Sequence, residues 1–131
     1  MSVLVDTSVW SLALRRDTPE RTREVDALAE SLEAGEVVFI GCVLQELLQG
    51  FPARDKTQRL VDYLAPFPLL ALHRGDVIFA AEIRNKCRAK GLAITTIDAQ
   101  IAAASINHRC RLLTADQDFT RISKHFPIRF A

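Results

Sequence analysis

At 131 residues, the chain has the length of one domain and can bury a substantial core. Its 49% hydrophobic and 25% charged content excludes a disordered protein, and its apolar runs are too short to cross a bilayer, so we expect no membrane segment. The net charge of +1 is unevenly distributed, because the first 50 residues hold 9 of the 16 acids but only 4 of the 17 Lys and Arg.

Strand-like and helix-like stretches alternate along the chain, which is typical of a parallel sheet flanked by helices. The expected strands cover 3–6, 36–40, 69–72, 111–114 and 128–130. One helix is expected to begin near Ser8, and a second to run from the cap Thr18 to Gly35. Five further helices are expected at 42–49, 53–64, 75–90, 96–106 (with Thr96 as cap) and 118–125. We therefore predict that residues 1–131 form a single three-layer α/β/α domain with a central, mainly parallel sheet of four or five strands.

The three cysteines are widely spaced and include no CxxC pair. They indicate reduced thiols in the core rather than a disulfide framework or a zinc ribbon. The first residues lack the basic region of a secretion signal and look instead like a first strand. Both features favour a cytoplasmic protein.

Four acids, far apart in sequence, are each set among apolar residues, where a charge is destabilising unless something compensates it. Asp6 ends the first strand, Glu46 lies one turn into the helix after the second strand, Asp98 lies in the first turn of its helix, and Asp116 follows the fourth strand. In open α/β sheets, ligands bind beyond the carboxyl ends of the strands. All four acids can therefore reach one cleft.

A group of carboxylates without His or Cys favours a hard divalent cation, Mg²⁺ or alternatively Mn²⁺. We expect Asp6 and Asp98 as direct ligands, and expect Glu46 and Asp116 to bind through water or to position the nucleophile. Such an ion polarises a phosphodiester and lowers the pKa of bound water. The four acids are therefore the predicted metal-binding and catalytic set, although Asp6 and Asp98 could alternatively serve only their local helix ends.

Three other residues are secondary candidates for the site. Asp118 lies in the first turn of the last helix, where an acid also complements the helix dipole. Thr7 and Thr114 lie near strand ends, where a hydroxyl can orient the acids, contact phosphate, or only satisfy local backbone. The four cations of residues 84–90 either complement the dipole of their own helix or face RNA.

The order and spacing of these motifs resemble those of PIN-domain ribonucleases, and specifically of VapC-type toxins from bacterial toxin–antitoxin pairs. The resemblance rests on Val-Leu-Val-Asp-Thr-Ser-Val-Trp, the mid-helix Glu46, Thr-Ile-Asp-Ala-Gln-Ile-Ala-Ala and Leu-Leu-Thr-Ala-Asp-Gln-Asp-Phe, and covers essentially the whole chain. It implies that the four acids form a Mg²⁺ site for endonucleolytic cleavage of RNA, often transfer or ribosomal RNA. It also implies a cognate antitoxin whose tail enters the groove, and commonly a homodimer.

Two other functions stay open at this point. A phosphatase would use Asp6 as a nucleophile, but its Asp-x-Asp pattern is absent, because Thr7 and Ser8 follow Asp6. A non-catalytic module would bind RNA or protein, and replacing the acids would not affect that binding.

Overall fold

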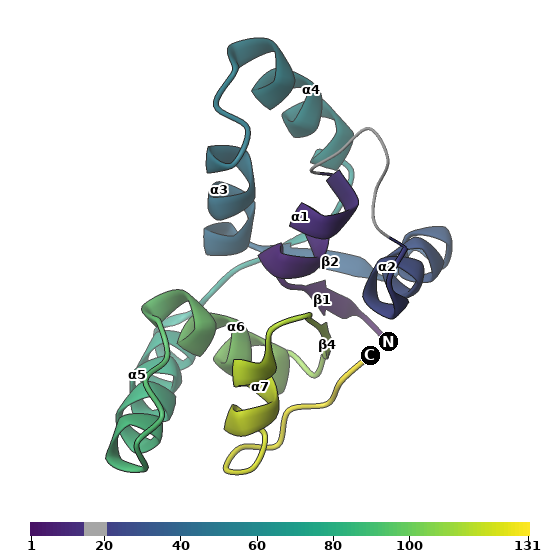
Figure 1. Ribbon diagram of the computed structural model, residues 1–131. Helices are drawn as coiled ribbons and strands as arrows, with labels where there is room; N and C mark the ends of the chain where they lie inside the picture. Colours follow the sequence, from purple (N-terminus) through teal and green to yellow (C-terminus); the bar gives the residue numbers. More distant parts are fainter. Residues whose placement is uncertain (15–20) are drawn as a thin grey trace.

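The computed structural model describes residues 1–14 and 21–131, which form a parallel sheet with helices around it (Figure 1). The sheet has four strands in the order β3-β2-β1-β4, and every pairing is parallel. The strands are β1 (Val3–Val5), β2 (Val37–Ile40), β3 (Leu69–Leu70) and β4 (Arg111–Leu113). The described helices are α1 (Thr7–Leu14), α2 (Arg23–Glu33), α3 (Gly41–Gln49), α4 (Arg54–Leu64), α5 (Arg74–Ala89), α6 (Thr96–Asn107) and α7 (Gln117–Ile122). This architecture confirms the predicted α/β class.

Both faces of the sheet are covered. Every residue of β1 and β2 is buried, whichever face its side chain points to. Continuous burial of this kind is expected of parallel strands that have helices on both sides. Helix α1 packs into the same core through Trp10, whose ring stacks on Phe39 with centroids 5.2 Å apart. Trp10 is therefore part of the core.

Helices α5 and α6 pack together as an antiparallel pair, and buried Asp76 joins one end of it. Asp76 Oδ1 accepts a hydrogen bond from Asn107 Nδ2 at 2.8 Å, and Asp76 Oδ2 lies 3.1 Å from Nε2 of His108. The backbone N–H of His73 also donates to this carboxylate. Because the start of α5 is tied to the end of α6, the last turns of α5 lie beside the start of α6.

Several expected element boundaries were wrong. The residues 128–130 do not form a strand, because the N–H of Ile128 bonds to the carbonyl of Phe126 and only Phe130 bridges to Leu112. Thr95, not Thr96, caps α6, since its hydroxyl accepts from the N–H of Asp98 at 3.0 Å. The last helix ends at Ile122 rather than at residue 125.

The expected cap Thr18 lies outside the described residues, and α2 begins at Arg23 with Thr22 as its cap. Cys87 and Cys110 are buried, Cys42 is half-buried, and all three are free thiols, as expected. None of the described helices has the length and apolar character needed to cross a membrane.

Candidate functional site

An open cleft with a volume of about 550 Å³ lies beyond the carboxyl ends of β1 and β4. Its lining contains the four acids singled out from the sequence, together with Asp118, Thr7 and further small side chains. The lining residues are Asp6, Thr7, Ser8, Ser11, Leu12, Glu46, Thr95, Asp98, Ala115, Asp116 and Asp118. The structure thus brings five carboxylates from four parts of the chain to one place.

The pairing of β1 with β4 places Asp6 beside Thr114. Val5 is opposite Leu113 in this pairing, and the N–H of Asp6 donates to the carbonyl of Leu113 at 2.9 Å. The next residue on each strand is therefore at the same edge of the sheet. Thr114 Oγ1 donates to Asp6 Oδ2 at 2.9 Å and accepts from the N–H of Asp116 at 3.0 Å. One hydroxyl connects two of the predicted site acids.

A second hydroxyl supports the same carboxylate oxygen. Ser8 Oγ donates to Asp6 Oδ2 at 2.7 Å and accepts from the N–H of Ala115 at 3.1 Å. Ser8 was not among the predicted site residues. The signal available for it is the hydroxyl two residues after an acid at a helix start, a spacing that favours local side-chain hydrogen bonds. Thr7 lines the cleft, but its buried Oγ1 has no hydrogen-bond partner among the described residues.

Asp98 is held at the start of α6 by a reciprocal capping arrangement. The N–H of Asp98 donates to Thr95 Oγ1 at 3.0 Å, and the N–H of Thr95 donates to Asp98 Oδ2 at 3.4 Å. Such a capping box satisfies two backbone donors that a helix start leaves free. The other oxygen of the Asp98 carboxylate, Oδ1, takes part in neither of these bonds.

Asp116 is the N-cap of α7, and its Oδ1 accepts from the N–H of Asp118 at 2.9 Å. Asp118, the second residue of α7, lines the same cleft. Carboxylate oxygens of Asp98, Asp116 and Asp118 all lie within 4.8 Å of one another. Asp118, a secondary candidate from the sequence, therefore lies within 4.8 Å of Asp98, as the primary candidate Asp116 does.

Glu46 reaches the cleft from the other side, on α3. Val43 and Leu47 of this helix are buried, so the helix packs on the sheet through them. Glu46 is half-buried and lines the cleft together with Asp6. Its position one turn into α3 is the one expected from the sequence.

Burial, and to a smaller extent the charge of nearby acids, disfavours the ionised forms of Asp6 and Asp98. Burial raises the pKa of Asp6 above its ordinary value, hydrogen bonds from Ser8, Thr114 and the backbone of Thr7 partly oppose the shift, and the charge of Asp116 adds to it. Burial likewise raises the pKa of Asp98, and Asp116 and Asp6 contribute to this shift. The charged forms need a nearby cation.

The donor set fits a hard divalent ion. The groups that converge are carboxylates and hydroxyls, and the cleft lining contains no His or Cys. Oxygen ligands of this type suit Mg²⁺ and Mn²⁺. A separation of up to 4.8 Å between oxygens of Asp98, Asp116 and Asp118 is larger than the distance between two ligands of one Mg²⁺, but short side-chain rotations can close it.

Several solved structures of other proteins have a fold similar to that of this chain. The FitAcB structure from Neisseria gonorrhoeae is similar with a TM-score of 0.75 and 24% identity, over 98% of this chain and 96% of that one. VapBC2 from Rickettsia felis bound to a promoter DNA fragment is similar with a TM-score of 0.75 and 19% identity, over 100% of this chain and 98% of that one. A toxin–antitoxin complex from Klebsiella pneumoniae is similar with a TM-score of 0.71 and 20% identity, over 96% of this chain and 93% of that one. These likenesses show the fold.

A search of curated proteins found no match. The sequence matches the PIN domain family over residues 3–125, a range that begins in β1 and extends past α7. This range includes every acid of the cleft. The chain therefore belongs to the PIN domain family.

Proposed function

We propose that the protein is a Mg²⁺-dependent endoribonuclease and acts as the toxin of a VapC-type toxin–antitoxin pair. The observation that carries the proposal is the convergence of Asp6, Glu46, Asp98, Asp116 and Asp118 on one cleft. Two of these carboxylates, Asp6 and Asp98, have raised pKa values and would be stabilised in their charged form by a cation. Membership of the PIN domain family supports a nuclease.

We assign the metal to the acids as follows. Asp98 is the first direct ligand, and Asp116 and Asp118 lie near enough to share the ion with it. Asp6, held through Oδ2 by Ser8 and Thr114, lines the same cleft. When bound, Mg²⁺ polarises the phosphodiester and acidifies a bound water.

The side chains around the acids keep them in place. Ser8 and Thr114 hold Asp6 against the sheet, and the capping box of Thr95 fixes the direction of Asp98. Glu46, on the opposite wall, is placed to accept a proton from the attacking water. Preorganised groups of this kind lower the barrier because they need little rearrangement during the reaction.

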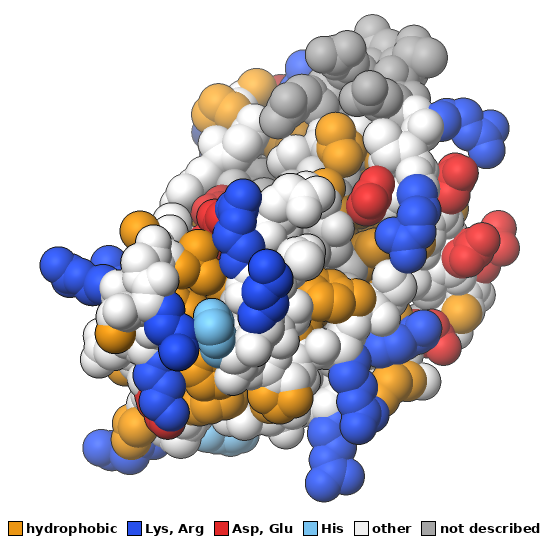
Figure 2. All heavy atoms as spheres, turned by 60° about the horizontal axis from the view of Figure 1, so that its bottom comes forward, with side chains coloured by type: hydrophobic (Ala, Val, Ile, Leu, Met, Phe, Trp, Pro, Cys, Tyr) orange, Lys and Arg blue, Asp and Glu red, His pale blue; other side chains and the backbone are white. Residues whose placement is uncertain are grey.

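RNA is supported as the substrate by the distribution of basic side chains. On the face shown in Figure 2, Lys and Arg side chains are spread over the surface and outnumber the visible acidic ones. The basic last turns of α5 lie beside the start of α6, where Arg84 Nε donates to the carbonyl of Ile94 at 3.3 Å. Ile94 immediately precedes Thr95 of the cleft. A polyanion entering the cleft therefore meets positive charge at its rim.

The partner we propose is a cognate antitoxin that closes the cleft. Support comes from the similar solved structures, one of which is described as a toxin–antitoxin complex and two as FitAcB and VapBC2. We also propose a homodimer. Co-expression with the product of the adjacent gene tests the partner, and a toxin is expected to be tolerated by its host only in that case.

Cleavage of RNA tests the function directly. Purified protein is expected to cut RNA with Mg²⁺ or Mn²⁺ and to lose the activity in a chelator. Asp6→Asn and Asp98→Asn are expected to fold and to be inactive. Asp62→Asn is the matched control, because Asp62 is exposed on α4 and outside the cleft. Normal cleavage by the first two variants would show that the acids are not the metal site.

A further inference from the structure

One cation lies in direct contact with the acid cluster. Arg121 follows Asp118 by three residues on α7, and its Nη1 donates to Asp118 Oδ1 at 2.7 Å. The carboxylate of Asp118 lies within 4.8 Å of those of Asp98 and Asp116. The guanidinium of Arg121 is therefore at the rim of the cleft. We propose that Arg121 binds a phosphate of the RNA substrate beside the bond that is cut, a role that rests on the proposed function.

Distances support this position. A phosphate bound at the acid cluster would lie beside the Asp118 carboxylate, which Arg121 Nη1 contacts at 2.7 Å. Rotation about the bonds of the long Arg side chain would bring the guanidinium to that phosphate.

Charge supports it as well. In the free protein Arg121 neutralises part of the acid cluster through Asp118. A divalent ion that takes the same acids competes with the guanidinium and repels it. Arg has five N–H donors in a planar fork that matches two oxygens of a phosphate. Binding of the ion therefore frees the guanidinium at the place where the anionic substrate arrives.

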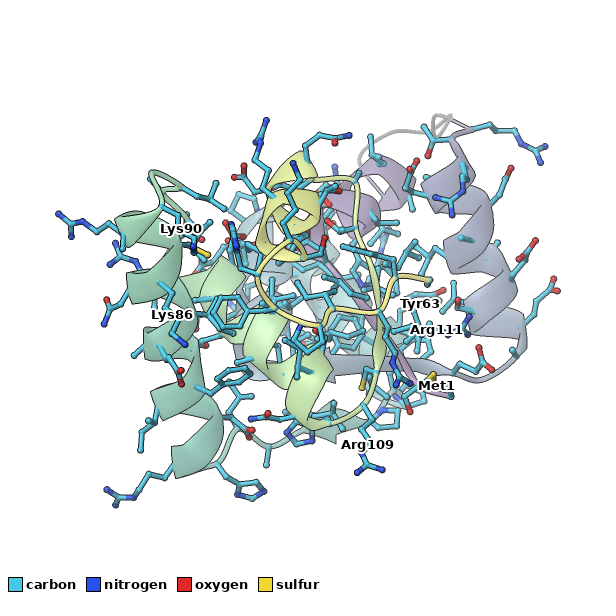
Figure 3. All side chains as sticks on the ribbon, turned by 90° about the horizontal axis from the view of Figure 1, so that it is seen from below. Met1, Tyr63, Lys86, Lys90, Arg109 and Arg111 are labelled. Carbon is cyan, nitrogen blue, oxygen red and sulfur yellow. The ribbon has the colours of Figure 1, made fainter. Side chains whose placement is uncertain are left out.

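The simpler alternative is an ordinary surface ion pair, which contributes little. The chain contains an example of such a pair away from the cleft. Arg111 Nη2 lies 3.3 Å from Glu36 Oε2, and the Arg111 side chain is 38% exposed. Arg111 is the first residue of β4, at the end of the sheet opposite the cleft, and Figure 3 shows it near Met1, whose amino group also lies near Glu36. Its partner Glu36 is not among the residues that line the cleft, whereas Asp118 is. Arg111→Gln is therefore the control for Arg121→Gln.

The test measures binding of a fluorescent single-stranded RNA by anisotropy with Ca²⁺, another divalent ion that takes oxygen ligands, in place of Mg²⁺, over a range of salt concentrations. Arg121→Gln is expected to weaken binding about tenfold. Its plot of log affinity against log salt should be shallower by about 0.7, the change expected for one lost phosphate contact to a single strand. Arg121→Lys should keep the wild-type salt slope, and Arg111→Gln should match wild type. Mn²⁺ affinity should be no weaker in Arg121→Gln than in wild type.

A double variant separates direct from indirect action. If Arg121 contacts RNA, adding Arg121→Gln to Asp118→Asn weakens RNA binding further, whereas an effect exerted only through Asp118 disappears in that background. Wild-type affinity and salt slope in Arg121→Gln, or no additional loss in the double variant, would overturn the proposal. Cleavage by wild type with Mg²⁺ is measured in parallel. Its absence would refute the proposed function, and its presence leaves the result for Arg121 interpretable.

Discussion

Thr114→Val removes one hydroxyl from the acid site and keeps the shape of the side chain. In the wild type, Thr114 Oγ1 donates to Asp6 Oδ2 at 2.9 Å. A hydrogen bond to a charged group contributes about 1.5–3 kcal/mol, and one between neutral groups about 0.5–1.5 kcal/mol. The variant should therefore lose about 1 kcal/mol more stability at a pH where Asp6 is ionised than at a pH where Asp6 is protonated. The pKa of Asp6, already raised by burial, should rise further.

The assay is urea unfolding on both sides of the Asp6 titration, with the carboxyl resonance of Asp6 followed by NMR. Thr57→Val is the control, since the hydroxyl of Thr57 donates to the neutral carbonyls of Phe51 and Ala53. Its loss of stability should not change with pH. An equal loss for Thr114→Val at both pH values, or an unchanged titration of Asp6, would refute the idea that this hydroxyl supports the charged carboxylate.

Three other perturbations test the fold and the site. Trp10→Ala should lower the free energy of unfolding in urea by about 3–5 kcal/mol, because the side chain is 1% exposed; a loss below that range would contradict its core role. Asp98→Asn should unfold at a higher temperature than wild type in a chelator and gain less from Mg²⁺, because its charged form is disfavoured in the free protein. Burial acts to raise the pKa of Asp76, but hydrogen bonds from Asn107, His73 and His108 outweigh it, so this pKa is lowered. The stabilisation from the Asp76 charge is present above the unfolded-state pKa and is lost as pH falls through the folded-state pKa. Asp76→Asn should therefore lower the free energy of unfolding by about 1–3 kcal/mol at neutral pH and by little in acid. A pH-independent loss would contradict this.

Four of the five expected strands are present, and they could be predicted because short apolar runs such as Val37–Ile40, which lies between Gly35 and Gly41, are typical of buried strands. The four acids could be placed at strand ends and helix starts for the same reason. The strand order could not be read from the sequence, because the pairing of β1 with β4 depends on packing between distant segments. That pairing is what places Thr114 against Asp6. The sequence therefore indicates Thr114 as a candidate, but it cannot show whether the Thr114 hydroxyl contacts Asp6 or only satisfies local backbone.

Helix ends explain the remaining differences. Thr95 and Thr96 are adjacent hydroxyl residues, so composition cannot decide which one caps α6. The capping of α7 by Asp116 places Asp118 in the first turn, facing the cleft, and a shift of one residue would turn it by about 100°. Such a shift is within the uncertainty of boundaries predicted from sequence. The sequence alone therefore cannot show that Asp118 faces the cleft, although the structure groups both Asp116 and Asp118 with Asp98.

Two buried aspartates with similar exposure, 5% for Asp6 and 7% for Asp76, have opposite environments. Asp76 is met by an amide, an imidazole and a backbone N–H, and its pKa is lowered, so its charge stabilises the fold. Asp6 is met by two hydroxyls and faces other acids, and its pKa is raised, so its charge opposes folding. Folding alone does not require an acid at position 6, since an uncharged residue there would avoid that repulsion. The environment of Asp6 therefore supports the proposed cation site.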